Sequence, residues 1–241
     1  MPRAVLCLPT YNERENLEAM IRDLGGVLDT SRDRVLVIDD ASPDGTGEIA
    51  DRLAAELAWV AVLHRDHKEG IGPAYIAGFR WALAEGAELV LEMDCDFSHT
   101  PADVPRLIEA AGDADLVLGS RYVRGGNVEN WGLARRLVSR AGSLYAQALL
   151  LTRVRDLTGG FKCYRREVLE RIDLDAVSSR GYAFQIETTY RALHAGFRVV
   201  EIPITFTDRE VGSSKMSRAI VLEAIWRVPY LGLRALAGRL R

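Results

Sequence analysis

The chain has 241 residues, of which 48% are hydrophobic and 27% charged, a length and balance typical of a globular enzyme with a substantial core. Its formal net charge of −3 at pH 7 argues against a nucleic-acid-binding protein, whose basic surface usually dominates the charge. The three cysteines form no C-x-x-C pair and no run of about 18 apolar residues occurs, which argues against a disulfide framework, a zinc site and a membrane-spanning helix.

The first elements are a strand, a turn and a helix. Residues 3–8 have the pattern of a strand, and the following Pro9-Thr10-Tyr11-Asn12 is typical of a turn in which Asn12 can cap a helix. Apolar residues then recur at helical spacing from Leu17 to Leu28. The sequence therefore predicts a strand that leads directly into an amphipathic helix.

The rest of the first half repeats this alternation. We expect strands at 34–38, 59–63, 89–93 and 115–118, separated by helices that start at Asp44 and lie near 72–85 and 101–111. Strands alternating with helices of this length predict an α/β fold with a mostly parallel, doubly wound sheet. Ligands of such sheets bind beyond the carboxyl ends of the strands. The polar stretches at 9–13, 39–40 and 94–96 follow strands, so we expect them to converge in one crevice.

The stretch Asp94-Cys95-Asp96 follows the apolar strand at 89–93. Side chains at i and i+2 of an extended chain point to the same side, so the two carboxylates repel each other unless a cation lies between them. Mg²⁺ is commonly bound by one or two carboxylates together with substrate phosphates, and Mn²⁺ accepts similar oxygen ligands. The stretch predicts a metal site for a nucleotide diphosphate, with a solvated acidic turn as the alternative.

The charge is unevenly distributed. Residues 1–118 carry 10 basic and 23 acidic side chains, whereas residues 119–171 carry 11 and 4. This pattern fits a metal–nucleotide site beside a surface that attracts phosphate groups, although ordinary surface variation is an alternative.

Seven motifs in this order carry a family resemblance: Pro9-Thr10-Tyr11-Asn12-Glu13, Asp39-Asp40-Ala41-Ser42, Asp94-Cys95-Asp96, Gly119-Ser120-Arg121-Tyr122, Leu157-Thr158-Gly159-Gly160-Phe161, Phe184-Gln185-Ile186-Glu187, and Asp208-Arg209 with Lys215. Together they resemble family-2 glycosyltransferases of the GT-A fold. Among these, the chain looks like the short dolichol-phosphate (polyprenol-phosphate) mannosyltransferases that lack C-terminal membrane helices. The resemblance covers about residues 3–217, which we interpret as one GT-A domain followed by a tail at 218–241.

The resemblance implies roles in donor binding and metal binding. The donor-binding residues would be Pro9, Tyr11, Glu13, Ile38, Asp40, Asp94, Cys95 and Arg121. Asp94 and Asp96 would hold Mg²⁺ or Mn²⁺, with Ser98 as a third candidate ligand. The family commonly has Gln at position 98 and Ala at position 95, and the shorter Ser98 favours contact through a water molecule. His99 is expected to be structural, because Mg²⁺ prefers oxygen ligands.

A second group of residues is predicted to act on phosphate groups and in catalysis. Arg121 follows an apolar strand, where its guanidinium can bind a phosphate through two hydrogen bonds. The resemblance assigns Arg135 to the acceptor phosphate together with Arg121, whereas Gly159 and Gly160 permit either close approach of a ligand or a turn. The predicted catalytic residues are Asp96, Arg209, Lys215 and Glu187. Arg209 and Lys215 flank a loop that can close over a diphosphate, and for Glu187 a buried ion pair is an equal alternative.

The tail from 218 to 241 combines five arginines with many apolar residues, among them Trp226 and Tyr230. Arg227, Arg234 and Arg241 recur every seven residues and share a stripe of a helix, which Pro229 is expected to kink. A basic amphipathic helix with Trp and Tyr is typical of a membrane interface. A helix that packs on the domain is an equal alternative.

The resemblance implies inverting transfer of mannose from GDP-mannose to a polyprenyl (dolichyl) phosphate, which gives a β-linked product and GDP. The acceptor needs no strong general base, because the second pKa of a phosphate monoester lies near ~6. The alternatives are another nucleotide sugar such as UDP-glucose, a hydroxyl acceptor, or a non-catalytic nucleotide-sugar-binding protein. We expect a cytoplasmic protein, peripherally attached to the cytoplasmic face of a membrane, with no nucleic-acid partner.

Overall fold

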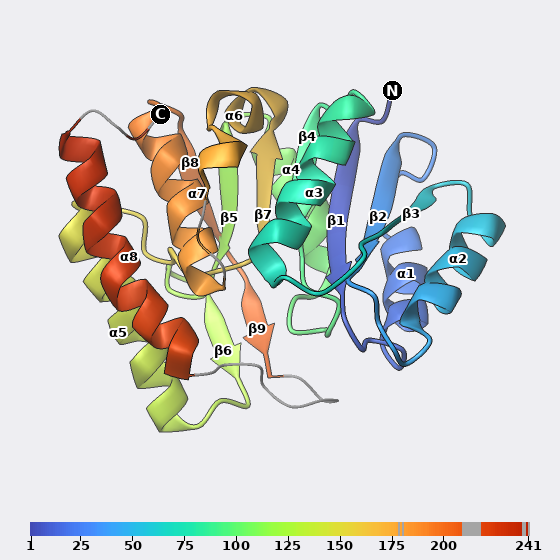
Figure 1. The fold of residues 1–241 in the computed structure, drawn as a ribbon, viewed down its shortest axis with the longest axis horizontal. Helices are drawn as coiled ribbons and strands as arrows, with labels where there is room; N and C mark the ends of the chain where they lie inside the picture. Colours follow the sequence, from blue (N-terminus) through green and yellow to red (C-terminus); the bar gives the residue numbers. More distant parts are fainter. Residues whose placement is uncertain (178, 180, 209–217, 238–239, 241) are drawn as a thin grey trace.

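The structure is a computed structural model that describes residues 1–177, 179, 181–208, 218–237 and 240. A seven-stranded sheet in the order β3-β2-β1-β4-β7-β5-β8 forms the centre of the molecule, and β6 and β9 form a separate two-stranded sheet (Figure 1). The strands are β1 (Ala4–Thr10), β2 (Asp33–Asp39), β3 (Val60–His64), β4 (Leu89–Glu92), β5 (Leu116–Ser120), β6 (Asn127–Glu129), β7 (Lys162–Arg165), β8 (Val199–Pro203) and β9 (Thr205–Thr207).

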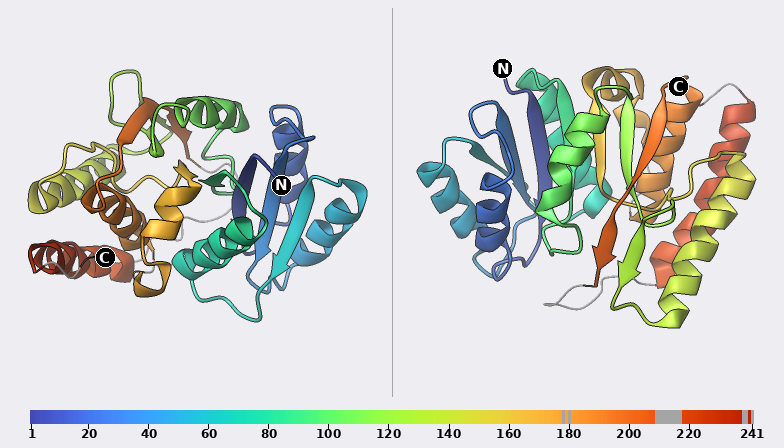
Figure 2. Two further views of the ribbon diagram at one scale, coloured as in Figure 1. Left: turned by 90° about the horizontal axis from the view of Figure 1, so that it is seen from above. Right: turned by 180° about the vertical axis from the view of Figure 1, so that it is seen from behind.

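Helices cover both faces of the sheet (Figures 1 and 2). They are α1 (Leu17–Gly25), α2 (Thr46–Glu56), α3 (Ile71–Ala84), α4 (Val104–Ala110), α5 (Leu133–Leu150), α6 (Arg166–Arg171), α7 (Tyr182–His194) and α8 (Arg218–Leu236), with short 3₁₀ helices at Pro101–Asp103 and Leu174–Ala176. One apolar core joins α1, α2 and α4 to one face of the sheet, and the other joins α3, α5, α6, α7 and α8 to the opposite face.

The alternation of side chains along each strand explains this two-sided core. In β1, Val5 and Cys7 belong to the core under α3, whereas Ala4, Leu6 and Leu8 belong to the core under α1. Because helices cover both faces, the strand is apolar at nearly every position, as is typical of buried parallel strands. The predicted α/β fold with a mostly parallel sheet is confirmed.

The structure corrects the sequence prediction at two places. β7 lies antiparallel between β4 and β5, and this strand was not predicted, because its four residues include two with positive charge. Asn12 is no helix cap: it has φ 57°, and α1 begins only at Leu17. The turn after β1 is therefore longer than predicted, and it provides backbone that can face a ligand.

The tail packs on the domain. Val228 and Leu231 of α8 are buried in the core shared with α5 and α7, and the Tyr145 hydroxyl donates a 2.9 Å hydrogen bond to the Ile225 carbonyl. Gly232, about two turns after Ile225, packs near the carbonyl of Leu149, which lies one turn after Tyr145. The two helices therefore run side by side in the same direction. None of the helices in the described part of the chain has both the length and the apolar composition needed to cross a bilayer.

The outer surface of this helix pair is unusually apolar. Within the described residues, every exposed large hydrophobic side chain except Met1 lies on α5, at its C-terminal cap or on α8. We call this surface the α5–α8 face; it comprises Leu133, Leu137, Val138, Leu144, Tyr145, Leu149, Leu151, Ile225, Trp226, Tyr230, Leu233 and Leu236. Arg227 and Arg234 are only half-exposed, so the outward stripe of α8 is apolar rather than basic.

Candidate active site

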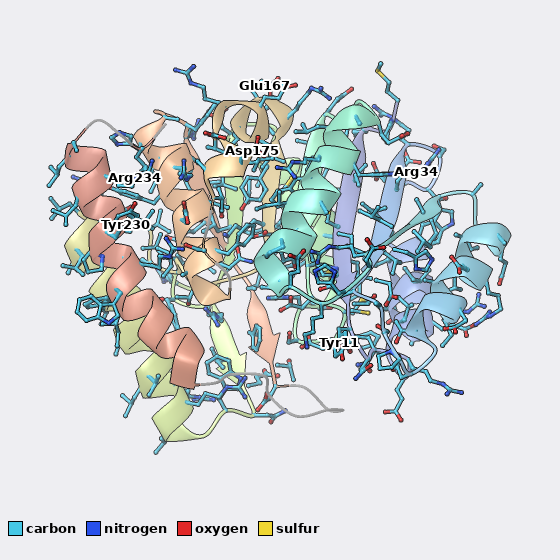
Figure 3. All side chains as sticks on the ribbon, viewed as in Figure 1. Tyr11, Arg34, Glu167, Asp175, Tyr230 and Arg234 are labelled. Atoms are coloured by element: carbon cyan, nitrogen blue, oxygen red, sulfur yellow. The ribbon has the colours of Figure 1, made fainter. Side chains whose placement is uncertain are left out.

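The carboxyl ends of β1, β2 and β4 lie side by side, because these strands are neighbours in the sheet. Hydrogen bonds link the turns that follow β1 and β2: the backbone N–H of Asn12 donates to Ser42 Oγ at 3.1 Å, and that of Glu13 to Thr46 Oγ1 at 3.0 Å. Tyr11 lies at this edge of the molecule, at the end of the sheet opposite to Arg34 (Figure 3). The predicted convergence of the first two polar stretches is therefore observed.

Charged groups surround Tyr11 and Asp40. The Lys68 ammonium lies 3.7 Å from the centre of the Tyr11 ring, and Arg65 Nη1 donates to Asp40 Oδ1 at 2.5 Å. Burial raises the pKa of the Asp40 carboxyl, and the Arg65 guanidinium opposes this rise. Arg65 thus keeps Asp40 oriented, a contact that no motif in the sequence indicated.

Two of the predicted donor-binding side chains point into the core instead. Ile38 is fully buried, and its Cδ1 lies so close to Gly78 of α3 that a Cβ there would come within 2.5 Å. Cys95 is 2% exposed and belongs to the core under α1. Ile38 lies with Leu36 in the core under α3, and Cys95 lies with Leu91 and Met93 in the core under α1, as positions i and i+2 of a strand share one face. Both side chains are buried in the described structure, and their donor-binding roles remain predictions.

The Asp94–Ser98 segment forms a fixed bend directly after β4. Asp96 is buried, and its Oδ1 accepts hydrogen bonds from the Ser98 backbone N–H at 3.0 Å and from the Ser98 hydroxyl at 2.5 Å. Asp94 is half-exposed, and the Tyr75 hydroxyl donates to its Oδ1 at the long distance of 3.5 Å. Ser98 therefore orients the Asp96 carboxylate, and its contact with a metal through a water molecule remains a prediction.

This donor set fits a hard divalent cation. Asp94 and Asp96 offer carboxylate oxygens, which Mg²⁺ and Mn²⁺ prefer. Among the described residues no group of three or more His, Cys, Asp or Glu side chains could hold a metal by itself. The remaining ligands would have to come from water and substrate phosphates, as is usual for Mg²⁺.

His99 packs in an aromatic cluster. Its ring lies 5.0 Å from that of Phe161 and 5.1 Å from that of Phe206, and its side chain is buried. Phe206 in turn contacts the Trp131 ring edge-on at 5.3 Å. The cluster connects the Asp94–Ser98 segment to β9 and to the start of α5, which agrees with the expected structural role of His99.

Arg121 forms a buried ion pair with Asp156. Arg121 Nε and Nη2 donate to the two carboxylate oxygens at 2.7 and 2.6 Å, and Asp156 is fully buried. Burial alone would raise the pKa of Asp156, but the Arg121 guanidinium holds it below its usual range. This pair fixes the direction of Arg121, so a phosphate could approach only the part of the guanidinium that Asp156 does not cover.

Arg135 lies in the first turns of α5. Its Nη1 donates to both oxygens of Asp208 at 2.7 Å, and its Cζ lies 4.3 Å from the centre of the Trp131 ring. Arg121 Cζ lies 5.7 Å from the centre of the same ring. The structure thus brings together the two arginines predicted for the acceptor phosphate.

Gly159 and Gly160 allow close packing within the protein. A Cβ on Gly159 would lie 3.3 Å from the carbonyl oxygen of Gly119, and one on Gly160 would lie 3.2 Å from Nε2 of Gln185. Both glycines therefore permit the segment before β7 to pass close to β5 and α7. Their approach to a ligand remains a prediction.

Glu187 is held in a buried ion pair. Its Oε1 accepts from Arg191 Nε at 3.0 Å, and its Oε2 accepts from the Ser179 hydroxyl at 2.5 Å. Both Glu187 and Arg191 are 2% exposed. The structure thus shows the ion pair that was one of the two alternatives for Glu187, and a catalytic role for this side chain remains a prediction.

A third buried charge pair joins β7 to β4, and no motif in the sequence indicated it. Lys162 of β7 and Glu92 of β4 are paired in register, with Lys162 Nζ 3.2 Å from Glu92 Oε1, and both side chains are fully buried. Lys162 Nζ also donates to Gln185 Oε1 at 2.5 Å. Glu92 stands two residues before Asp94, so this pair supports the strand that carries the predicted metal site.

Arg209 and Lys215 lie outside the described residues. An open cavity of about 710 Å³ lies at the opposite end of the sheet and includes Arg3 and Asp33, which bond to each other. It touches none of the predicted site residues.

The sequence matches Glycosyl transferase family 2 over residues 5–173. It is 51% identical over 233 residues to the undecaprenyl-phosphate mannosyltransferase of Micrococcus luteus, with 97% of this chain and 95% of that protein covered. It is also 48% identical over 241 residues to the polyprenol monophosphomannose synthase of Mycolicibacterium smegmatis, with 99% and 90% covered.

Solved structures share the fold. Glucosyl-3-phosphoglycerate synthase from Mycobacterium tuberculosis, in complex with Mn²⁺, UDP-glucose and phosphoglyceric acid, gives a TM-score of 0.66 at 22% identity, covering 94% of this chain and 80% of that one. A mannosyltransferase from Pyrobaculum calidifontis, in complex with GDP-Man and Mn²⁺, gives 0.60 at 17% identity, covering 98% and 74%. At these identities the likeness concerns the fold, and the predicted GT-A fold is confirmed.

Proposed function

The chain belongs to glycosyl transferase family 2, and we propose that it transfers mannose from GDP-mannose to a polyprenyl phosphate, with inversion, and releases GDP. The observation that carries this proposal is the match at about half identity, over nearly the full length, to two proteins named for mannosyl transfer to undecaprenyl phosphate and for polyprenol monophosphomannose synthesis. GDP-mannose as the donor is further supported by the neighbour solved with GDP-Man.

We place the donor at the carboxyl ends of β1, β2 and β4. Asp40, oriented by Arg65, would accept hydrogen bonds from the base or ribose, and Pro9, Tyr11 and Glu13 would line the pocket. Asp94 and Asp96 would hold Mg²⁺ or Mn²⁺, a proposal that the Mn²⁺ complexes of two neighbours support. When bound, the cation would neutralise charge on the leaving diphosphate.

The acceptor phosphate would lie at Arg121 and Arg135. Arg121 is held by Asp156 and Arg135 by Asp208, so both guanidinium groups are oriented before the acceptor arrives. A phosphate monoester is already largely dianionic at neutral pH, so no side chain needs to remove a proton. Glu187 is thus not needed as a base, which agrees with the hydrogen bonds that its two carboxylate oxygens accept from Arg191 and Ser179. Arg209 and Lys215 would stabilise the leaving diphosphate.

Membrane attachment would involve the α5–α8 face. This face begins beside Arg135 in α5, and α5 and α8 run from that end of the molecule along its side (Figure 2). Trp226, Leu137 and Leu233 are 77%, 69% and 66% exposed. A polyprenyl chain lies among lipids with its phosphate at the surface, so a membrane against this face would present the phosphate close to Arg135.

Replacing Trp226 and Leu233 together by Ser is expected to lower binding to anionic phospholipid vesicles at least ~10-fold, because both side chains lose apolar area buried in the interface. Vesicle sedimentation measures the change. The double variant Arg52→Ser and Glu56→Ser, on the exposed part of α2, is the matched control. Turnover with a short, detergent-soluble acceptor should stay unchanged, and an equal loss with short and long acceptors would contradict the membrane role.

A panel of radiolabelled nucleotide sugars with short polyprenyl phosphates tests the reaction itself. GDP-mannose is expected to give a labelled product that partitions into organic solvent, whereas UDP-glucose is expected to give little. Preference for UDP-glucose, or for an acceptor with only a hydroxyl, would favour another family-2 reaction. The absence of any turnover would favour a nucleotide-sugar-binding protein.

A further inference from the structure

Trp131 lies between the two arginines of the proposed acceptor-phosphate site. Asn130, with φ 61°, ends β6 in a left-handed turn, and Trp131 follows just before α5 begins. The indole is 9% exposed and packs edge-on against Phe206. Arg135 Cζ and Arg121 Cζ lie 4.3 and 5.7 Å from the centre of the ring. One aromatic ring therefore contacts two guanidinium groups of the same charge.

The electrons of the ring favour this arrangement. An aromatic face attracts a cation, and the attraction is strongest for Trp. The ring thus lies between two guanidinium groups and keeps them at a separation at which one doubly charged anion could contact both. The ring is a spacer as well as a packing group.

Two polar atoms of this cluster indicate which class of ligand it could bind. Among the described residues, the buried Trp131 Nε1 has no hydrogen-bond partner, and the same holds for the buried Nε of Arg135. Both are N–H donors, and they belong to side chains in direct contact. Buried donors without an acceptor are uncommon, because their desolvation is not compensated. Two of them in one cluster point to an anionic acceptor.

The Arg135 guanidinium has one end occupied and another available. Asp208 binds Nη1 through both carboxylate oxygens, whereas Nε lies on the other side of the planar group. Asp208 therefore orients Arg135 without using its Nε–H. A phosphate oxygen at this side could accept from Arg135 Nε, and a second oxygen could accept from the neighbouring indole.

We propose that Trp131 is a binding residue for the acceptor phosphate: its ring holds Arg121 and Arg135 apart, and its Nε1–H donates to a phosphate oxygen beside Arg135 Nε. The inference rests on the proposed function. It adds the uncharged Nε1–H group of Trp131 to the two arginines of the acceptor-phosphate site. Since both N–H groups are buried here, phosphate binding has to include a rearrangement of the cluster, and the indole should report it.

Two substitutions separate the ring from the N–H group. Trp131→Phe keeps an aromatic face but removes the donor, and it is expected to raise KM for farnesyl phosphate about tenfold or more, because hydrogen bonds to charged groups are strong. KM for GDP-mannose should stay unchanged. Trp131→Ala removes both functions and should raise KM for the acceptor further. An unchanged acceptor KM in Trp131→Phe, or an equal rise of both KM values with a lower Tm, would overturn the proposal.

Fluorescence gives a second measurement that needs no turnover. Binding of farnesyl phosphate to the wild-type protein is expected to change its tryptophan emission, and Trp131→Phe should abolish the change. Trp59→Phe, at the distant residue directly before β3, is the matched control and should retain it. If the wild type transfers no mannose but the emission responds to the phosphate through Trp131, the proposed reaction fails and the binding site stands. If Trp131→Phe retains the full response, the site fails.

Discussion

Replacing Asp96 by Asn is expected to lower kcat about 10³-fold or more while the protein stays folded. The change removes one of the two carboxylate charges at the proposed metal site, and a bound metal ion supplies several kcal/mol of charge stabilisation in such reactions. Asn keeps an oxygen that can accept from the Ser98 N–H and hydroxyl, so the bend after β4 should persist. Steady-state assays with GDP-mannose and a short acceptor measure the loss.

Two controls accompany this variant. Asp113→Asn, an exposed residue before β5, should leave kcat unchanged. EDTA should inactivate the wild type, and Mg²⁺ or Mn²⁺ should restore activity. Full activity of the wild type in EDTA would contradict the metal role and return Asp94-Cys95-Asp96 to a structural acidic turn.

Replacing Lys162 by Met is expected to lower the free energy of unfolding by about 3–5 kcal/mol, because it leaves the fully buried Glu92 without its cation. Urea unfolding followed by circular dichroism measures the change. Adding Glu92→Gln to Lys162→Met should recover most of the lost stability, since neither charge then remains. Equal stability of the two variants would show that Glu92 is not charged in the folded protein.

The pH dependence gives an independent check. Burial raises the pKa of the Glu92 carboxyl, and Lys162 opposes this rise in the wild type. Without Lys162 the folded state binds a proton more tightly than the unfolded state does. Stability of Lys162→Met relative to wild type should therefore be greatest below the ordinary pKa of Glu, and it should decrease as the pH rises.

The sequence predicted most elements of the first half because their patterns are local. Strand alternation and helical spacing fix β1 to β4 and the helices between them, and the motifs after these strands lie at one edge by topology alone. β7 could not be predicted in this way. It is four residues long, it has a buried lysine, and only the partner Glu92 on a distant strand explains that lysine.

The residues of the candidate site also differ in whether the sequence alone could identify them. Asp94, Asp96 and Arg121 stand in motifs with recognisable spacing, and the family resemblance adds Arg135. The contacts that orient the site cannot be read from the sequence: Arg65 and Asp156 belong to no motif, and Asp208, although it stands in a motif, orients Arg135 through a tertiary contact. The burial of Ile38 and Cys95 also depends on tertiary packing, because the core under α3 encloses Ile38 and the core under α1 encloses Cys95.

The antiparallel β7 also constrains how the chain assembles. β4 and β5 are not neighbours, and within the described residues only β7 joins the half-sheet β3-β2-β1-β4 to the half-sheet β5-β8. During synthesis the first half-sheet is complete long before residues 162–165 leave the ribosome, so the edge of β4 has unpaired backbone groups in the meantime. The nascent chain is thus most prone to aggregate in this interval, and chaperones that shield strand edges would act on it there.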